Sequence, residues 1–128
     1  MNIKIICLAV SLFFLVTALT PAARAEEIDV RLLAKAIQNV AGVESYTVMV
    51  SLGSVLLNRL SDECYPSSLA AVIADAGIDI SLAEPCERAV RAAVDAAGGF
   101  DPTCGALHFK YGEYDGEVAL ATDRWFFY

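Results

Sequence analysis

The stretch from Ser45 to Leu60 reads SYTVMVSLGSVLLNRL, and it decides the fold that we expect for this chain. Ser45 is a good N-cap residue, and the apolar residues after it cover nearly the whole circumference of a helix predicted over Tyr46–Leu60. A helix that is apolar all round is buried by its neighbours. Gly53 and Ser54 in its middle allow a neighbouring helix to approach closely. This segment is therefore predicted to be the central helix of a helical core.

Two of the surrounding helices are predicted from apolar spacing and capping residues. Residues from Glu26 to about Gln38 carry a one-sided apolar stripe, with acids in the first turn where the helix dipole favours them. Gly42 ends this helix. A short helix over residues 69–75 has a capping serine at either position 67 or position 68.

The last third of the chain changes character. A further helix begins near Pro85 and ends before the glycines at 98 and 99. Residues 106–111 and 125–128 have strand-like composition and are separated by a turn rich in glycine and acidic residues. We therefore predict a small, mostly helical α+β domain with a C-terminal β-hairpin. The face of the helix near Pro85 that should be buried consists of Ala89, Val90, Ala93, Val94 and Ala97.

The N-terminus has the layout of a secretory signal peptide. Lys4 precedes an uncharged apolar run, Ile5–Leu19, and small residues of a cleavage site follow up to Ala25. The run is shorter than the roughly 20 residues that a membrane-spanning helix needs. We expect residues 1–25 to be removed and residues 26–128 to form an exported domain without a stable membrane span. An uncleaved membrane anchor is the alternative.

The charge of the remaining domain argues against two classes of partner. Lys4 and Arg24 leave with the signal peptide, so seven basic residues remain against sixteen acidic ones, a net charge of −9. Binding to nucleic acid or to anionic lipid needs clustered basic residues. We therefore expect neither partner, and the acidity is typical of a solvated surface.

Three cysteines remain after cleavage, and export permits disulfides. One bridge plus one free thiol is the simplest arrangement. A bridge between Cys86 and Cys104 is disfavoured because the intervening helix should be about 18 Å long. Cys64 would then be one half of any bridge, and its partner stays open. A zinc site would need closely spaced ligands, and His108 is the single histidine. We expect no metal ion or other cofactor. The disulfide candidates are Cys64, Cys86 and Cys104.

Three segments resemble the SleB-type cell wall hydrolases. Residues 32–46 are similar to the family's first helix, which ends in an acidic A-E-A-R-G-E type motif, and residues 50–60 are similar to the next helix, which ends in V-x-L-N-R-V. Residues 100–109, FDPTCGALHF, are similar to the family's W-D-P-T-G-G-A-L-Y-F stretch. Trp125 follows an Ala-Thr pair, much as a tryptophan does in that family. The resemblance covers most of residues 26–128 and identifies a divergent member.

This resemblance implies a lysozyme-like fold and peptidoglycan as the substrate, including the spore cortex. SleB-type domains cleave the glycan strand in the manner of lytic transglycosylases. Such chemistry needs one carboxylic acid held protonated beside the glycosidic oxygen. Ungapped alignment places Val40 where the family has this catalytic glutamate, and a valine side chain cannot donate a proton. Only the second acid of the motif has a counterpart, which is Glu44.

The remaining candidates each have a functional and a structural interpretation. Glu44 could enter the cleft as a displaced catalytic acid, or it could be a solvated charge. Asn58 and Arg59 could contact substrate, or they could hold their own helix end or a neighbouring loop. Asp101 could bind substrate, or it could form a turn by accepting backbone N–H groups. Trp125 could stack on sugar rings or pack in the core.

Two functions from different classes follow from these residues. The first is an exported, peptidoglycan-directed domain that resembles a glycan-cleaving hydrolase and is impaired by Val40. The second is a non-catalytic protein of the envelope that binds glycan or a protein partner. An acidic side chain elsewhere in the cleft would favour the first, and an entirely apolar cleft would favour the second.

Overall fold

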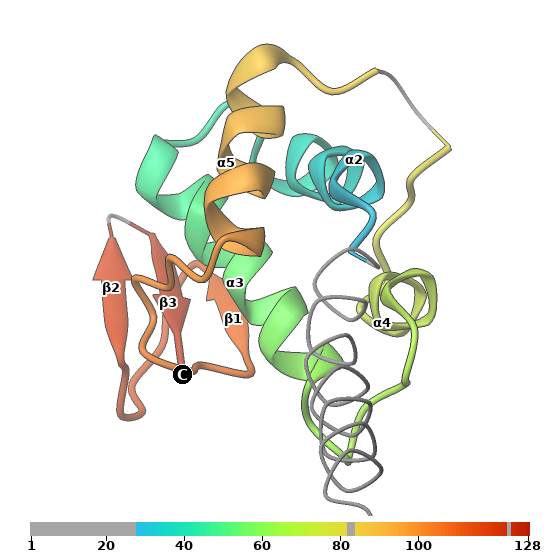
Figure 1. The fold of residues 1–128 in the computed structure, drawn as a ribbon. Coiled ribbons are helices and arrows are strands. Elements are labelled where there is room, and N and C mark those ends of the chain that lie inside the picture. Colours follow the sequence, from blue (N-terminus) through green and yellow to red (C-terminus); the bar gives the residue numbers. More distant parts are fainter. Residues whose placement is uncertain (1–27, 82–83, 123) are drawn as a thin grey trace, which may run out of the picture.

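The computed structural model describes residues 28–81, 84–122 and 124–128. Within these residues the chain forms helices first and short strands last (Figure 1). This order confirms the predicted α+β class. None of the described helices is long and apolar enough to span a membrane, and the expected signal peptide lies outside the described residues. The elements are α2 (Val30–Ala41), α3 (Tyr46–Leu60), α4 (Leu69–Asp75), α5 (Glu87–Ala97), β1 (Phe109–Tyr111), β2 (Leu120–Thr122) and β3 (Trp125–Phe127).

Helix α3 is the centre of the fold, as predicted. The Ser45 side chain accepts a hydrogen bond from the backbone N–H of Val48, at 3.4 Å, and this cap starts the helix at the expected residue. Every residue from Val48 to Leu56 is buried. The helix packs against α2, α4, α5 and strand β3. The apolar circumference read from the sequence is therefore covered on all sides.

Helix α5 lies so close to α3 that small side chains form the contact. A Cβ atom on Gly53 would lie 3.1 Å from Cβ of Ala96 and 3.0 Å from Cδ1 of Ile37. The prediction that Val90 and Val94 face the core is wrong, because they are 38% and 52% exposed. A valine cannot fit where two helix backbones approach this closely, so the helix turns its alanines inward. The buried residues of α5 are Ala89, Ala92, Ala93 and Ala96.

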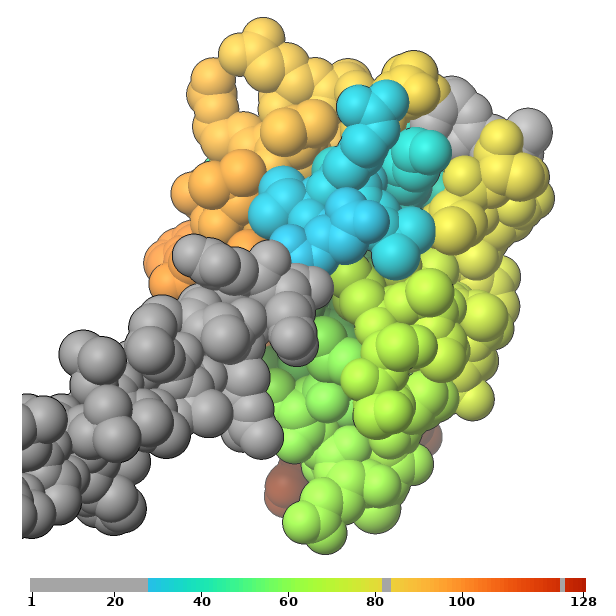
Figure 2. Space-filling view, turned by 45° about the vertical axis from the view of Figure 1, so that its right-hand side comes forward, coloured from blue at the N-terminus to red at the C-terminus, as the bar shows by residue number. Residues whose placement is uncertain are grey.

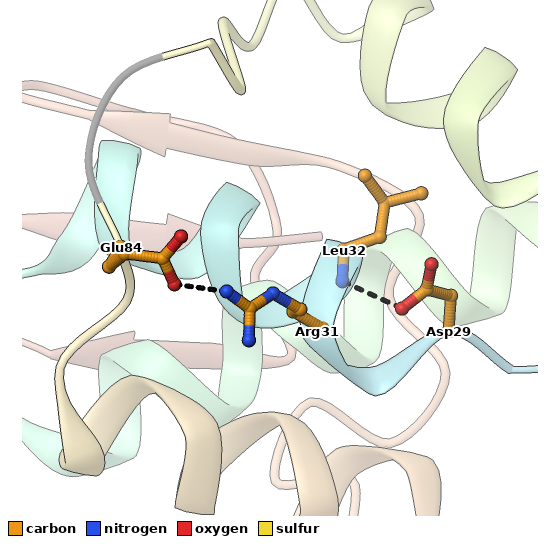
Figure 3. A network of polar contacts seen from close by, with 4 residues as sticks. All are labelled: Asp29, Arg31, Leu32 and Glu84. Carbon is orange, nitrogen blue, oxygen red and sulfur yellow. Dashed lines mark hydrogen bonds and ion pairs between the residues drawn. The ribbon is translucent and has the colours of Figure 1, made fainter.

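Helix α2 begins later than expected. Asp29 is its N-cap and accepts a hydrogen bond from the backbone N–H of Leu32, at 3.0 Å (Figure 3). The helix therefore does not begin at Glu26, and its first turn contains no acid. Both points correct the expectation from the sequence, because the carboxylate of Asp29 lies one residue before the helix. In the space-filling view, α2 (blue) reaches the surface between α5 (orange) and the α4 region (lime green) (Figure 2).

The strands form an antiparallel sheet in the order β1-β3-β2. The pairing of β1 with β3 confirms the predicted hairpin partners. Strand β2 was missed because it lies within the segment assigned to the turn, and it pairs with the other edge of β3. His108 exchanges backbone hydrogen bonds with Tyr128, at 2.8 and 3.0 Å, just outside β1. Its side chain is exposed.

Candidate functional site

The position expected to hold a catalytic acid is apolar and packed. Val40 lies in the last turn of α2 and is partly buried against the hydrophobic core. Glu44 lies beyond the helix end, in the loop between α2 and α3. Its backbone N–H donates to the carbonyl of Ala41, at 3.1 Å, and its carbonyl accepts from Arg88 Nη2, at 3.4 Å. The loop is therefore tied both to α2 and to α5 by its backbone.

The acids of α5 and of the loop before it are engaged with other side chains. Asp95 accepts a hydrogen bond from the hydroxyl of Tyr46, at 2.5 Å. Partial burial, together with this hydrogen bond to Asp95, raises the pKa of the Tyr46 hydroxyl. Glu87 pairs with Arg91 along the helix surface. Two further contacts join α2 to the start of α5. They are the hydrogen bond from the Cys86 backbone N–H to Gln38 Oε1, at 3.0 Å, and the exposed ion pair of Arg31 with Glu84 (Figure 3).

No described carboxylate has the surroundings of a general acid. A carboxylic acid stays protonated near neutral pH when an apolar pocket desolvates it. In residues 28–81, 84–122 and 124–128 the fully buried polar side chains are Ser51, Ser54 and Thr103, none of which is a carboxylate. The described part of the chain therefore offers no buried acid in place of the missing glutamate.

Asp101 organises the loop that follows α5. Its Oδ1 accepts hydrogen bonds from the backbone N–H and the hydroxyl of Thr103, at 2.8 and 2.6 Å. Its Oδ2 accepts from the Gly105 backbone N–H, at 2.8 Å, and from Asn58 Nδ2, at 3.0 Å. Burial would raise the pKa of this carboxyl, but the hydrogen bonds outweigh burial and hold the pKa below its ordinary value. Asp101 is therefore a turn-forming anion and not a proton donor.

The end of α3 holds the same loop. Asn58 Nδ2 also donates to the carbonyl of Ala106, at 3.0 Å, and Arg59 Nε donates to the carbonyl of Leu107, at 2.6 Å. The Arg59 guanidinium lies over two rings, 5.1 Å from the centroid of Tyr65 and 5.6 Å from that of Phe109. The interpretation that this pair holds a neighbouring loop is confirmed by these contacts.

A pocket of about 210 Å³ lies beside this loop, where α3 and α5 end. Asn58 and Asp101 line it with polar atoms. Ser54 also lines it, and its hydroxyl donates to the carbonyl of Phe100, at 3.0 Å. Ser54 and Thr103 were missed as parts of this arrangement. The spacing Asp-Pro-Thr signals Thr103 as a local partner of Asp101, whereas nothing local to Ser54 indicates its contact with residue 100.

The structure thus brings together three of the five candidate residues. Asn58, Arg59 and Asp101 meet at the C-terminal end of α3. Glu44 precedes the other end, and the part of α3 from Tyr46 to Asn58 alone is about 18 Å long. Trp125 is 6% exposed on β3, and its ring contacts those of Phe109 and Tyr111 at 6.2 and 5.2 Å. The catalytic candidate and the three clustered binding candidates therefore belong to separate regions.

The cysteines lie on separate surface segments. Cys64 is in the loop between α3 and α4, Cys86 precedes α5, and Cys104 is in the loop held by Asp101. All three thiols are free and exposed. The expected disulfide is therefore not formed in the structure, because each cysteine belongs to a different loop. In the described ranges, no group of histidine, cysteine and acidic residues is placed to hold a metal ion.

Comparison with known proteins agrees with the fold and the motifs. No family model matches the chain. The chain is 37% identical over 87 residues to the spore cortex-lytic enzyme of Bacillus subtilis (strain 168). This match covers 63% of the chain and 28% of that enzyme. The spore cortex-lytic enzyme of Halalkalibacterium halodurans is 33% identical over 87 residues, covering 63% of this chain and 26% of the relative. The chain therefore spans less than a third of the length of these relatives.

Two solved structures share the fold. The catalytic domain of the Bacillus cereus SleB protein has a TM-score of 0.66 and 26% identity, covering 77% of this chain and 88% of that one. The catalytic domain of the germination-specific lytic transglycosylase SleB from Bacillus anthracis has a TM-score of 0.63 and 25% identity, covering 77% and 92%. The fold is thus of the lysozyme-like class. In sequence and in fold the chain is similar to SleB catalytic domains, from which it has diverged.

Proposed function

We propose that the chain is an exported, peptidoglycan-directed SleB-like domain that binds glycan strands without cleaving them. The observation that carries this proposal is the valine at position 40, half-buried where the family has its catalytic glutamate. The similarity to spore cortex-lytic enzymes and to SleB catalytic domains supports peptidoglycan as the target. The signal-like N-terminus supports a location outside the cytoplasm.

The loss of cleavage follows from the chemistry of glycosidic bonds. Protonation of the leaving oxygen requires an acid within hydrogen-bond reach. Val40 has no proton to give, and the low pKa of Asp101 keeps that carboxyl ionised near neutral pH. Glu44 stands outside the helix in a loop. Because none of these side chains can protonate the glycosidic oxygen, the bond is not cleaved. The domain retains the glycan-directed surface of its relatives and uses it for binding.

The test combines binding and digestion. Purified protein is sedimented with insoluble peptidoglycan, and the soluble products are separated by mass after prolonged incubation. We expect the protein in the pellet and no anhydro-sugar fragments in solution. Protein that stays in the supernatant would refute the peptidoglycan target.

A pair of variants tests the displaced acid. Glu44→Gln removes the proton donor with almost no change in shape, and Glu63→Gln makes the same change at an exposed position between α3 and α4. We expect both to behave like the parent. Fragments released by the parent and by Glu63→Gln, but lost in Glu44→Gln, would identify an active enzyme and overturn the non-catalytic part of the proposal.

A further inference from the structure

The sheet has a second face that the core does not use. Along β3, Trp125 and Phe127 are buried, whereas Phe126 between them is only partly buried and points to the opposite face. Its direct partners on the neighbouring strands are Lys110 and Ala121, both of which are exposed. The three strands lie at one edge of the molecule (Figure 1). This outer face therefore reaches solvent.

Aromatic rings gather on this face from three separate segments. Tyr114, in the loop after β1, stacks on Tyr128 with 4.3 Å between ring centroids and 14° between ring planes. It also lies 5.9 Å from the ring of Phe126. The ring of His108 also stacks on Tyr128, with 5.2 Å between the ring centroids. We call this set of rings, His108, Tyr114, Phe126 and Tyr128, the outer platform.

A glycine allows the platform to form. A Cβ atom on Gly116 would lie 2.3 Å from the hydroxyl oxygen of Tyr114 and 2.5 Å from the adjoining ring carbon. The tyrosine ring therefore lies across the turn backbone in the space that any other residue would fill. Its position is set before a ligand arrives, which lowers the entropic cost of binding.

A cavity of about 360 Å³ opens beside the platform and is lined by Lys110, Glu113, Tyr114 and Asp115. This volume is within the roughly 300–1,000 Å³ typical of small-molecule sites. The ion pairs among the described residues are Arg31–Glu84 and Arg91–Glu87, so the charges around the cavity are not neutralised by close pairing. The Lys110 Nζ lies 5.9 Å from the centroid of the Tyr114 ring. The cavity therefore offers a ligand one ammonium donor at the edge of the platform and two carboxylate acceptors. Their net negative charge disfavours phosphates and other polyanions.

We propose that the cavity and the outer platform form a binding site for an uncharged oligosaccharide of N-acetylated amino sugars. A pyranose ring has an apolar face that can lie on the Tyr114 ring, while its hydroxyl and amide groups reach Lys110, Glu113 and Asp115. Such an arrangement joins an aromatic surface to a few convergent polar groups. The choice of sugar rests on the proposed function. The site itself uses no residue of α2 or α3 and is separate from Val40.

The test is calorimetric titration of the purified protein with the N-acetylglucosamine tetramer. Tyr114→Ala removes the stacking ring, and we expect a Kd at least about tenfold higher, as for loss of an aromatic anchor. Glu113→Gln changes one acceptor on an exposed side chain and leaves the fold intact, and we expect a Kd raised about threefold. Tyr111→Ala is the matched control, because this 53% exposed tyrosine lies on the other face of the same sheet. It should bind like the parent.

The outcomes separate this inference from the proposed function. A parent that binds the tetramer, with Tyr114→Ala and Glu113→Gln binding equally well, would overturn the outer site and leave the proposed function standing. A parent that sediments with peptidoglycan but does not bind the tetramer would also overturn the outer site and leave the proposed function standing. A parent that binds neither would overturn both.

Discussion

The substitution Asp101→Asn tests the account of the loop after α5 most sharply. The parent carboxylate accepts four hydrogen bonds, two on each oxygen. In the variant the oxygen can still serve Thr103, which is fully buried. The new NH₂ group, however, would face the donors of Asn58 and Gly105. Hydrogen bonds to a charged acceptor contribute roughly 1.5–3 kcal/mol each, and water can replace part of this at the exposed Gly105, so we expect a loss of about 2–3 kcal/mol in the free energy of unfolding.

The pH dependence adds a second constraint. Because the pKa of Asp101 is lowered in the folded state, its contribution to stability is complete above the unfolded pKa of about 3.9 and is lost as the pH falls through the folded value. The difference between parent and Asp101→Asn should therefore be largest near neutral pH and should shrink in the acid range below about pH 4.

Urea denaturation followed by circular dichroism measures both effects. The control is Asp79→Asn, because Asp79 Oδ1 also accepts from the backbone N–H and the hydroxyl of a residue two positions later, Ser81, at 2.8 and 2.6 Å. Asp79 is exposed, and among the described residues it has no partner like Asn58, so its variant should unfold like the parent. An Asp101→Asn protein as stable as Asp79→Asn near neutral pH would refute the reasoning. A difference that does not change with pH would refute the ionic part of it.

Three further predictions concern the helices and the thiols. Gly53→Ala should lower the free energy of unfolding by about 1 kcal/mol in urea denaturation, because the overpacking against Ala96 exceeds the gain in helix propensity; a stabilised variant would contradict this close approach. Ala93→Val should lower the melting temperature by several degrees through overpacking of about 1–3 kcal/mol, whereas Val94→Thr, on the exposed side, should leave it nearly unchanged; the reverse ranking would restore the face expected from sequence. A thiol reagent added to the native protein should modify each exposed cysteine without prior reduction, as read by peptide mass, and a resistant pair would reveal a disulfide. These cysteines are Cys64, Cys86 and Cys104.

Much of the helical architecture could be predicted from local signals. Helix caps are short-range features whose hydrogen bonds need no tertiary information. The cap Ser45 is confirmed, and of the two serines left open before α4 the structure has Ser68 as the cap. The apolar circumference of α3 predicted its central place for the same reason. The rotation of α5 could not be predicted, because it depends on how closely two backbones approach at Gly53. Residue hydrophobicity alone ranks Val94 above Ala93 as a core residue.

The sheet and the site were harder to predict, since both depend on non-local contacts. Strand β2 has three residues and gains its pairing from an edge of β3 that the sequence does not reveal. Asn58, Arg59 and Asp101 were singled out from the sequence as candidates, but their meeting depends on contacts between residues more than 40 positions apart. The outer platform was not found for the same reason, because Tyr114 reaches Tyr128 only after the loop folds over the sheet.

The measurement that tests the central claim most directly is digestion of purified peptidoglycan by the parent and by Val40→Glu, with the products separated by mass. The account predicts that the parent releases no anhydro-sugar fragments. It also predicts that Val40→Glu, which restores a carboxyl group at the end of α2, begins to release them. Fragments released by the parent at the rate of the variant would contradict the account, because cleavage would then not require an acid at position 40.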